Sequence, residues 1–541
     1  MPGSARGRGS PPGVPRGHHP AVFSLTARFL RLAGTLGVLV AAGLPSQAAD
    51  RASAGLRGAF VINEDNSHFF GTRPPEAMNL AGLHAFIDQY AGTKVTHLFL
   101  SPNSMRASFR SRTRDAIWDP VEGREPEGLW PRNARRLHEA GLDPYAVWIA
   151  RSRERGISPW LSMRMNDVHN ADDPSSYMHS EFWRRHPELR RVPGGAGQPW
   201  TNHALNYAHA AVRDHQLAFV RELLERYDPD GLELDWMRFG HHLTPGREQE
   251  ESHLITAFMR EVRELTRSWS ARRGRPILLG VRAAAHPDAA AGLGVDAARW
   301  AREGLVDLIV PAPFWSSSDF DIPVELWREK IGAAAERVPV LPALEHNARA
   351  WIRGATVAND LASAYGFAAT ALHRGADGVY LFNWMDSQTR PVNEADYARL
   401  LRTGFSPVAV ADEPRRHPVT FRDTVPPGFP NGTQLPMKLP GKGTVRLHLG
   451  PGDGGGSAHA VVGLASATGD IARLRVRLNG RELIPAGEVS DRRLIAGAAR
   501  APRFACPPGS VRPGENNLEF TAPNGADPLE IVWVEIRVAP R

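Results

Sequence analysis

The sequence predicts an α/β fold, a (β/α)₈ TIM barrel followed by a small C-terminal antiparallel β-sandwich. The chain has 541 residues, of which 42% are hydrophobic and 23% charged, as in a globular protein with room for about three domains. Short apolar segments alternate with helical patterns between residues 56 and 401, after which Pro and Gly become frequent. We therefore expect a signal peptide at residues 1–49, the barrel at 50–405 and the β-sandwich at 406–541.

Residues 1–49 have the pattern of a signal peptide. Five arginines and no acidic residue occur in them, an apolar segment spans 32–44, and small residues follow at Ala48 and Ala49. The apolar segment is shorter than the about 20 residues that a membrane span needs. We expect a secreted or periplasmic protein with no membrane segment after signal removal; an anchor helix that begins near Val22 is the alternative.

The charge of the chain does not favour nucleic acid as a partner. The net charge is +7 and the pI is about 9.8, but the five arginines of residues 1–49 carry most of that excess. Without them the charge is about +2, and no long basic run with interleaved aromatic residues is left. Cys506 is the single cysteine, which excludes an internal disulfide and a cysteine-based metal cluster. We predict no cofactor.

Eight short apolar segments carry the barrel prediction. Helical patterns such as residues 213–227 lie between them, with apolar residues at helical spacing, and strand–helix alternation of this kind is typical of a parallel barrel. An open, doubly wound sheet is the alternative, and it is disfavoured because no Gly-rich turn follows the first segment. The eight predicted strands are residues 58–63, 96–101, 158–163, 231–236, 277–281, 305–311, 338–344 and 378–383.

The C-terminal segment reads as antiparallel strands. Polar and apolar residues alternate at 445–449, 474–478 and 531–538, and Asn479-Gly480 is a hairpin signal. We expect this domain to brace the barrel rather than to bind a glycan.

The fourth predicted strand carries two acids that face the same way. Glu233 and Asp235 are two residues apart, and in a strand such side chains lie on one face. Acids that face the interior of a barrel are costly unless they are paired or used. Arg164 and Arg238, at the ends of the third and fourth strands, are the expected counter-charges of Asp235.

The seventh predicted strand ends in Glu345, at the same end of the barrel as Asp235. Two carboxyl groups across a barrel mouth are what glycoside hydrolysis requires, since one protonates the leaving oxygen and the other attacks the anomeric carbon or activates water. Asp235, Glu345 and Glu233 are therefore the predicted catalytic residues.

Polar and aromatic residues follow most other strands, where the loops of a barrel build a site. We expect them to bind a carbohydrate substrate through sugar hydroxyls and ring faces. No third ligand accompanies Asp167 and His169, so no metal site is predicted. The predicted substrate-binding residues are Arg164, Asn166, Asp167, His169, Arg238, Trp315, Asn383, Trp384 and Asp386.

The fourth strand resembles the Asp-Gly-x-Asp-x-Asp-x-Glu signature of chitinase-type glycoside hydrolases, with Met237 in the place of the proton-donating Glu. That replacement argues against chitinase chemistry. The barrel region is more similar to the bacterial glycosyl-hydrolase-like family ten, through Asn206-Tyr207, Val212-Arg213-Asp214 and the Asp230-Gly231 that precedes Asp235. This resemblance implies a (β/α)₈ hydrolase in which Asp235 is the leading catalytic candidate.

The sequence thus predicts an exported glycoside hydrolase that acts on a poly- or oligosaccharide. Two alternatives remain. One is a non-catalytic glycan-binding barrel. The other is a lyase of uronate chains, in which Arg164 and Arg238 neutralise a carboxylate while His169 or Tyr207 removes a proton.

Overall fold

The computed structural model describes residues 53, 55–173, 175–193, 199–314, 317–389, 394–451, 456–468, 471–490, 495, 497–523 and 528–540. The predicted signal peptide and Trp315 lie outside these residues. No helix in the described part of the chain is long and apolar enough to cross a membrane.

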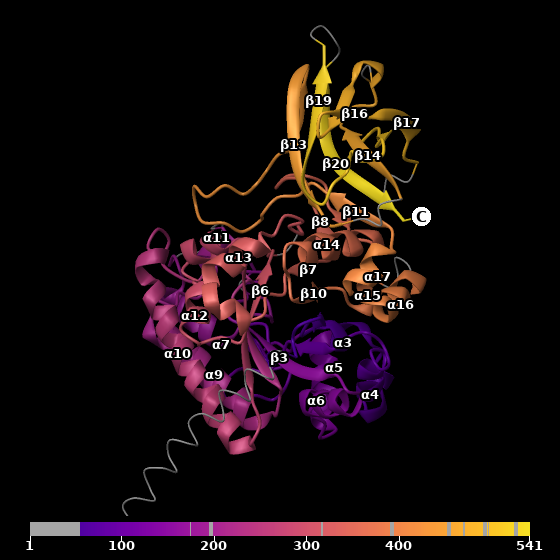
Figure 1. Cartoon of the computed structure of the whole chain (residues 1–541). Coiled ribbons are helices and arrows are strands. Elements are labelled where there is room, and N and C mark those ends of the chain that lie inside the picture. Colours follow the sequence, from indigo (N-terminus) through magenta and orange to yellow (C-terminus); the bar gives the residue numbers. More distant parts are fainter. Residues whose placement is uncertain are drawn as a thin grey trace, which may run out of the picture. The chain divides into compact units, whose positions relative to one another are not determined.

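An eight-stranded parallel sheet forms the first part of the structure (Figure 1). Its order is β6-β5-β4-β3-β2-β1-β10-β7, so successive barrel strands are neighbours, which excludes the doubly wound alternative. The ends β6 and β7 meet through a parallel bridge between Ile309 and Val340, and the sheet is nearly closed. This agrees with a TIM barrel. The strands are β1 (Ala59–Glu64), β2 (His97–Leu100), β3 (Ser158–Arg164), β4 (Gly231–Asp235), β5 (Leu278–Ala284), β6 (Leu308–Ala312), β7 (Ala343–Glu345) and β10 (Gly378–Phe382).

Each of the eight predicted strands overlaps one of these strands. The largest difference is at residues 338–344, where Val340 forms only an isolated bridge and β7 begins at Ala343. A short hairpin of β8 (Asn347–Ala348) and β9 (Val357–Ala358), which the sequence did not predict, follows β7.

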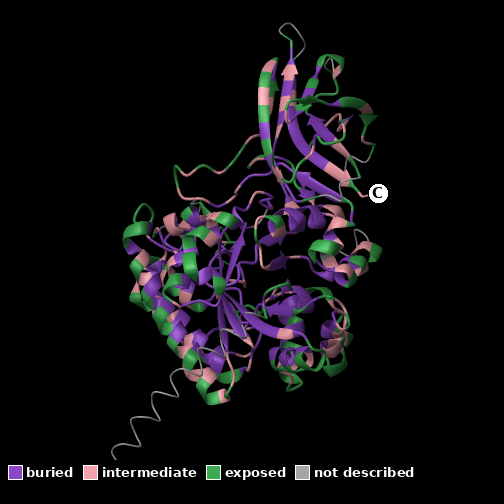
Figure 2. Cartoon of the chain, viewed as in Figure 1, coloured by how far each residue is buried: buried purple, intermediate pink, exposed green. Residues whose placement is uncertain are grey.

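Helices connect the strands and turn their exposed faces outward, while the sheet is buried (Figure 2). The helices between β1 and β4 are α3 (His68–Thr72), α4 (Leu80–Asp88), α5 (Leu129–Glu139), α6 (Pro144–Glu154), α7 (Glu181–Arg185), α8 (Trp200–His203) and α9 (Ala210–Arg226). Those that follow are α10 (Glu248–Arg273), α11 (Pro287–Gly292), α12 (Ala297–Arg302), α13 (Val324–Ile331), α14 (Leu361–His373), α15 (Asp386–Thr389), α16 (Glu394–Thr403) and α17 (Pro407–Ala411). Single 3₁₀ turns lie at Pro75–Ala77, Pro187–Leu189, Gly332–Glu336 and Ile471–Arg473.

The long helix α10 shows why these segments are helical. Three acids lie in its first turn and two arginines in its last, where each charge interacts favourably with the helix dipole. Gly274 ends the helix with φ of 66°, a left-handed conformation that glycine adopts at little cost.

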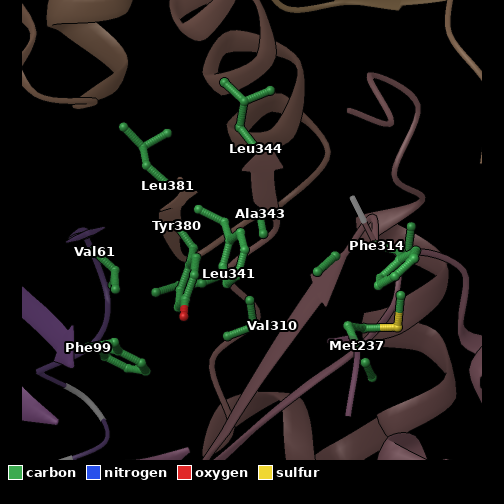
Figure 3. Close-up of a cluster of buried hydrophobic side chains, with 14 of the residues drawn as sticks. Val61, Phe99, Met237, Val310, Phe314, Leu341, Ala343, Leu344, Tyr380 and Leu381 are labelled. Carbon is green, nitrogen blue, oxygen red and sulfur yellow. The ribbon is translucent and has the colours of Figure 1, made fainter. Parts of the chain in front are cut away.

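The barrel interior changes from apolar to polar toward the carboxyl ends of the strands. At the lower level Trp160 stacks on Phe99, with ring centroids 4.6 Å apart, and a Cβ at position 231 would lie about 2.4 Å from the Trp160 ring. Only glycine fits there, which explains the Asp-Gly pair before β4. Figure 3 shows Val61, Phe99, Val310 and Tyr380 in this packing. One level higher, the strand register places Arg164, Asp235 and Arg282 side by side.

The C-terminal region contains two antiparallel sheets. The six-stranded sheet has the order β11-β20-β14-β18-β17, with β12 also on β20, and the four-stranded sheet has the order β13-β19-β15-β16. The predicted hairpin at Asn479-Gly480 joins β15 to β16, as expected. The strands are β11 (Arg415–Pro418), β12 (Met437–Leu439), β13 (Gly441–Leu449), β14 (Ser457–Leu464), β15 (Arg475–Leu478), β16 (Arg481–Glu482), β17 (Ile484–Glu488), β18 (Pro502–Ala505), β19 (Gly514–Ala522) and β20 (Leu529–Ala539).

These sheets contact the barrel through α14. A Cβ at Gly366 would lie 2.0 Å from the Arg416 carbonyl oxygen, so β11 and α14 approach closely. Arg416 Nη1 donates to Asp360 Oδ2 at 3.0 Å, and Thr370 Oγ1 donates to the His448 carbonyl at 3.2 Å.

Candidate active site

A cavity of about 500 Å³ lies at the carboxyl ends of the barrel strands. It is formed by the segments that follow β1, β3, β4, β7 and β10 and by the start of α5, so residues far apart in sequence meet there. This is the face on which barrel enzymes carry their sites. Its lining residues are Asp65, Asn66, Ser67, Trp130, Arg164, His169, Tyr177, Met178, Arg238, Glu345, His346, Asn347, Asn383 and Met385.

Glu345 is the predicted catalytic residue that reaches this cavity. Its side chain is 2% exposed, and Asn383 Nδ2 donates to its Oε1 at 2.5 Å. Its Oε2 is buried and has no hydrogen-bond partner among the described residues. Burial raises the pKa of Glu345 to about 8, although Asn383 and the guanidinium groups of Arg238 and Arg282 act against that rise. Glu345 is therefore a protonated acid at neutral pH.

The backbone of Asn383 has an unusual conformation. It follows β10 with φ of 61°, in the left-handed region that asparagine tolerates better than most residues. Trp384, the next residue, is fully buried and packs against His346 with ring centroids 5.9 Å apart. It does not line the cavity.

Asp235 lies beneath the cavity and does not line it. It is 1% exposed, and its Oδ1 accepts hydrogen bonds from the backbone N–H groups of Met237 and Arg238, both at 2.9 Å. The third donor is Arg282 Nε, at 2.8 Å. Arg282, rather than the expected Arg164 and Arg238, is thus its ion-pair partner. The reason is the register of β5, which places the Arg282 side chain next to Asp235 inside the barrel.

Arg282 is a fully buried cation that the sequence analysis did not identify. Its guanidinium carbon lies 3.7 Å from the centre of the Phe382 ring, and its Nη1 and Nη2 have no hydrogen-bond partner among the described residues. The sequence contains an indication of this residue. Arg282 follows the predicted strand 277–281, and if the strand continues by one residue its side chain faces the barrel interior, as that of Asp235 does.

Glu233 lies deeper in the barrel than Asp235 does. Ser162 Oγ and Tyr380 Oη donate to its Oε1 at 2.6 and 3.0 Å, and Asn63 Nδ2 donates to Tyr380 Oη at 2.7 Å. Burial and the neighbouring Asp235 raise the pKa of Glu233 to about 7. The fully buried side chain does not touch the cavity.

Another part of the cavity wall is an ionic network centred on Arg164. Its Nη1 donates to Asp167 Oδ2 at 2.8 Å, and its Nη2 donates to Asp65 Oδ2. The guanidinium groups of Arg164 and Arg238 hold the pKa of Asp65 well below its usual range, so Asp65 is ionised. Among the described residues, Asp65 and Glu345 are the acidic side chains that line the cavity.

His169 connects this network to the cavity. Its Nδ1 lies 2.6 Å from Asp167 Oδ1, and its Nε2 lies 3.0 Å from Arg238 Nη2. Because Arg238 can only donate, Nε2 is the acceptor and Nδ1 carries the proton that is shared with Asp167.

Two other predicted binding residues have partners elsewhere. Asn166 Nδ2 donates to the Leu205 carbonyl at 3.1 Å, and its Oδ1 accepts from Leu205 N, so its carboxamide holds two loops together. Asp386 accepts from Arg73 Nη2 at 2.7 Å and lies 2.9 Å from His68 Nε2. Neither residue lines the cavity.

The described residues contain no group of three or more His, Cys, Asp or Glu side chains that could hold a metal ion. Nine cavity residues are not among the predicted site residues: Asp65, Asn66, Ser67, Trp130, Tyr177, Met178, His346, Asn347 and Met385. Asp65 and Asn66 directly follow β1, so their place at the carboxyl end of a strand would have predicted them as site residues. No local pattern distinguishes Trp130 and Tyr177 from tryptophans and tyrosines that only pack the loops.

No protein-family model matches the chain, and no curated protein matches its sequence. Among solved structures, the chain is similar to alpha-L-fucosidase isoenzyme 2 from Paenibacillus thiaminolyticus, with a TM-score of 0.40 and 14% identity over 64% of this chain and 48% of that chain. It is also similar to the GH36 alpha-galactosidase AgaB from Geobacillus stearothermophilus, with a TM-score of 0.33 and 14% identity over 88% of this chain and 55% of that chain. A third is a glycoside hydrolase family 18 N-acetylglucosaminidase from Paenibacillus barengoltzii, with a TM-score of 0.33 and 11% identity over 64% of this chain and 98% of that chain.

These neighbours are glycoside hydrolases, and the chain spans about half the length of the first two. At these TM-scores the similarity assigns no activity to the chain. The residues of the cavity are therefore the evidence for its function. The specific family expected from the strand-four motif stays a prediction.

Proposed function

We propose that the chain is an exported glycoside hydrolase that cleaves a poly- or oligosaccharide, with Glu345 as its general acid. The observation that carries this proposal is the pair of cavity carboxyl groups in opposite protonation states. Glu345 is protonated at neutral pH because it is buried, and Asp65 is ionised because it is paired with arginine. Glycoside hydrolysis needs one carboxyl group of each kind.

We assign the proton of Glu345 to its Oε2, which has no hydrogen-bond partner among the described residues. Oε1 accepts the hydrogen bond from Asn383, which leaves Oε2 to carry the proton to the glycosidic oxygen as the bond to the anomeric carbon breaks. A general acid with a pKa near the working pH is both protonated and a good donor.

We assign the role of nucleophile or base to Asp65 and a supporting role to Asp235. Asp65 lines the cavity, whereas Asp235 lies below it and fixes the backbone of Arg238 and the side chain of Arg282. The sequence had favoured Asp235 for the first role. We prefer Asp65 to Asp235 because a nucleophile must reach the anomeric carbon of a substrate in the cavity, and of the two carboxylates only Asp65 lines it.

The test is a panel of plant and algal glycans, assayed for release of reducing ends with the purified chain and four variants. Glu345→Gln and Asp65→Asn should each lower kcat by about 10²–10⁴-fold. At pH 7 the melting temperature of Glu345→Gln should equal or exceed that of the parent, because burial disfavours the charged form of Glu345. Asp65→Asn should also lower the melting temperature, because the buried Arg164 loses an ion-pair partner. Asp235→Asn should lower the melting temperature as well as the activity. Glu264→Gln, an exposed site on α10, is the control and should leave both unchanged. Full activity of Glu345→Gln on a cleaved glycan would refute the proposal.

A lyase of uronate chains is the second candidate, because His169 lines the same cavity as Arg164 and Arg238 and its Nδ1 lies within hydrogen-bond distance of Asp167. Tyr207, the other predicted base, is fully buried and donates to the Met165 carbonyl at 2.6 Å, so it is not available. A lyase would give unsaturated products that absorb in the near ultraviolet and would lose activity on His169→Ala. A glycan-binding barrel would bind oligosaccharides without releasing reducing ends.

A further inference from the structure

The part of the cavity wall formed by Asn66, Trp130 and Tyr177 contains a buried polar side chain that has no partner in the described part of the chain. Asn66 is 2% exposed, and neither its Nδ2 nor its Oδ1 has a hydrogen-bond partner among the described residues. An unpartnered buried amide is costly, so such a group is rare in a folded protein unless something else binds it. Because Asn66 lines the cavity, that partner would come from the cavity.

The position of Asn66 is fixed by its neighbours. Ser108 Oγ donates to the Asn66 carbonyl at 3.1 Å and lies 3.2 Å from Trp130 Nε1, which donates to it. One serine therefore holds both Asn66 and Trp130 in place. The indole N–H is used in this contact, so the Trp130 ring is available to the cavity only as an apolar surface.

Tyr177 completes the wall. Its ring lies edge-on to Trp130, with centroids 6.4 Å apart, and the buried Arg106 donates to the Tyr177 carbonyl at 3.0 Å. Met178, the next residue, also lines the cavity. The result is a rigid apolar surface beside a carboxamide that offers one donor and one acceptor.

We propose that Asn66, Trp130 and Tyr177 form a specificity subsite for a sugar residue that presents a hydrogen-bond acceptor and a donor side by side, next to an apolar face. Two kinds of sugar have this chemistry: a ring with vicinal hydroxyls, and a ring with an acetamido group. The carboxamide pairs with the donor and the acceptor, and Trp130 packs against the apolar face. The subsite deepens the proposed glycosidase function, but it requires only binding.

The experiment measures binding by calorimetry on the full chain carrying Glu345→Gln. Cellotetraose supplies vicinal hydroxyls without acetamido groups, and chitotetraose supplies acetamido groups. We expect at least one of them to bind, and the preferred one identifies the substituent. Adding Asn66→Ala should weaken that binding by about tenfold to a hundredfold, since both hydrogen bonds are lost.

Two further variants separate recognition from structure. Asn347→Ala removes another cavity asparagine, whose side chain already pairs with His346, and should weaken binding less than about threefold. Asn66→Leu keeps the number and branching of the side-chain heavy atoms but removes both polar atoms. It should weaken binding as Asn66→Ala does, while the melting temperature stays equal or rises, because the free protein loses no hydrogen bond.

The subsite is overturned if neither tetrasaccharide binds, or if Asn66→Ala and Asn66→Leu bind as the parent does. A lower melting temperature of Asn66→Leu with unchanged affinity would also overturn it, by showing a structural role. The proposed hydrolase function fails separately, when the chain binds an oligosaccharide but does not cleave it.

Discussion

Two buried glutamates of this protein have opposite surroundings. In the C-terminal region, fully buried Glu535 on β20 accepts hydrogen bonds from Arg416 Nη2 at 2.7 Å, Arg537 Nε at 2.5 Å and Trp533 Nε1 at 3.1 Å. These arginines lower the pKa of Glu535 below its usual value despite burial. In the barrel, Asn383 is the one donor to Glu345 among the residues that the structure describes, and the pKa of Glu345 is raised to about 8.

The difference separates a structural carboxylate from a reactive one. Both oxygens of Glu535 are satisfied, so it is a fixed anion that ties strands together. Oε2 of Glu345 has no hydrogen-bond partner among the described residues, and burial keeps the group protonated at neutral pH. Burial alone does not predict which kind a carboxyl group is, since both side chains are almost fully buried.

The largest expected effect is on activity. Glu345→Gln should lower kcat by at least about a hundredfold while Glu535→Gln leaves the activity of each folded molecule unchanged, because the proposed reaction uses Glu345 and not Glu535. Turnover is measured on a cleaved glycan and normalised to the folded fraction from circular dichroism. Equal losses in the two variants would contradict the distinction.

The next effect is on stability. Glu535→Gln removes the anion from a buried pair and leaves Arg416 and Arg537 uncompensated, which should lower the free energy of unfolding by about 3–5 kcal/mol. Urea denaturation at pH 7 measures this. Glu482→Gln, an exposed site on β16 whose pair with Arg475 lies at the surface, is the matched control and should cost under about 1 kcal/mol. A loss as small as the control's would mean that the pair is not structural.

The third effect is on the pH dependence of stability. The pKa of Glu345 is about 8 in the fold and 4.5 in its ordinary state, so between these values the unfolded chain releases a proton that the folded chain keeps. Stability is therefore lost as pH rises through this window, and Glu345→Gln removes that loss. The melting temperature of the variant relative to the parent should rise from pH 4.5 to pH 8 and then level off. A constant difference would mean that the pKa of Glu345 is not raised.

The smallest effect concerns Asn383, whose hydrogen bond favours the ionised form of Glu345. Asn383→Gly should move the alkaline limb of the kcat profile upward by less than about one pH unit. Glycine tolerates the φ of 61°, whereas Asn383→Ala places a Cβ in the left-handed region and should cost about 1 kcal/mol more. A downward shift of the limb, or equal stability of the two variants, would contradict this account.

Much of the fold could be predicted from local patterns. The eight barrel strands were predictable because each is a short apolar segment that is buried on both faces, and the Asp230-Gly231 pair has a direct cause in the Trp160 ring. The hairpin at Asn479-Gly480 was predictable from turn chemistry. Most strands of the C-terminal sheets were not, because their short alternating segments are interrupted by Pro and Gly.

The site was predictable only as a set of strand ends. Arg164, His169, Arg238, Glu345 and Asn383 do meet at one cavity, as expected for residues at the carboxyl ends of barrel strands. The pairing within that set was not predictable. Arg282 holds Asp235 because of the register between β4 and β5, and no local pattern contains that register.

The sequence by itself determined how many barrel strands there are and which end of them carries the polar residues, because both depend on hydrophobic periodicity and on residues adjacent in the chain. The tertiary structure alone decided which carboxyl groups are ionised. A carboxyl pKa depends on the cations and donors within a few ångströms, and for Glu345, Asp65 and Asp235 those come from other strands. The sequence placed acids at the barrel mouth, and the packing around each one set its protonation state.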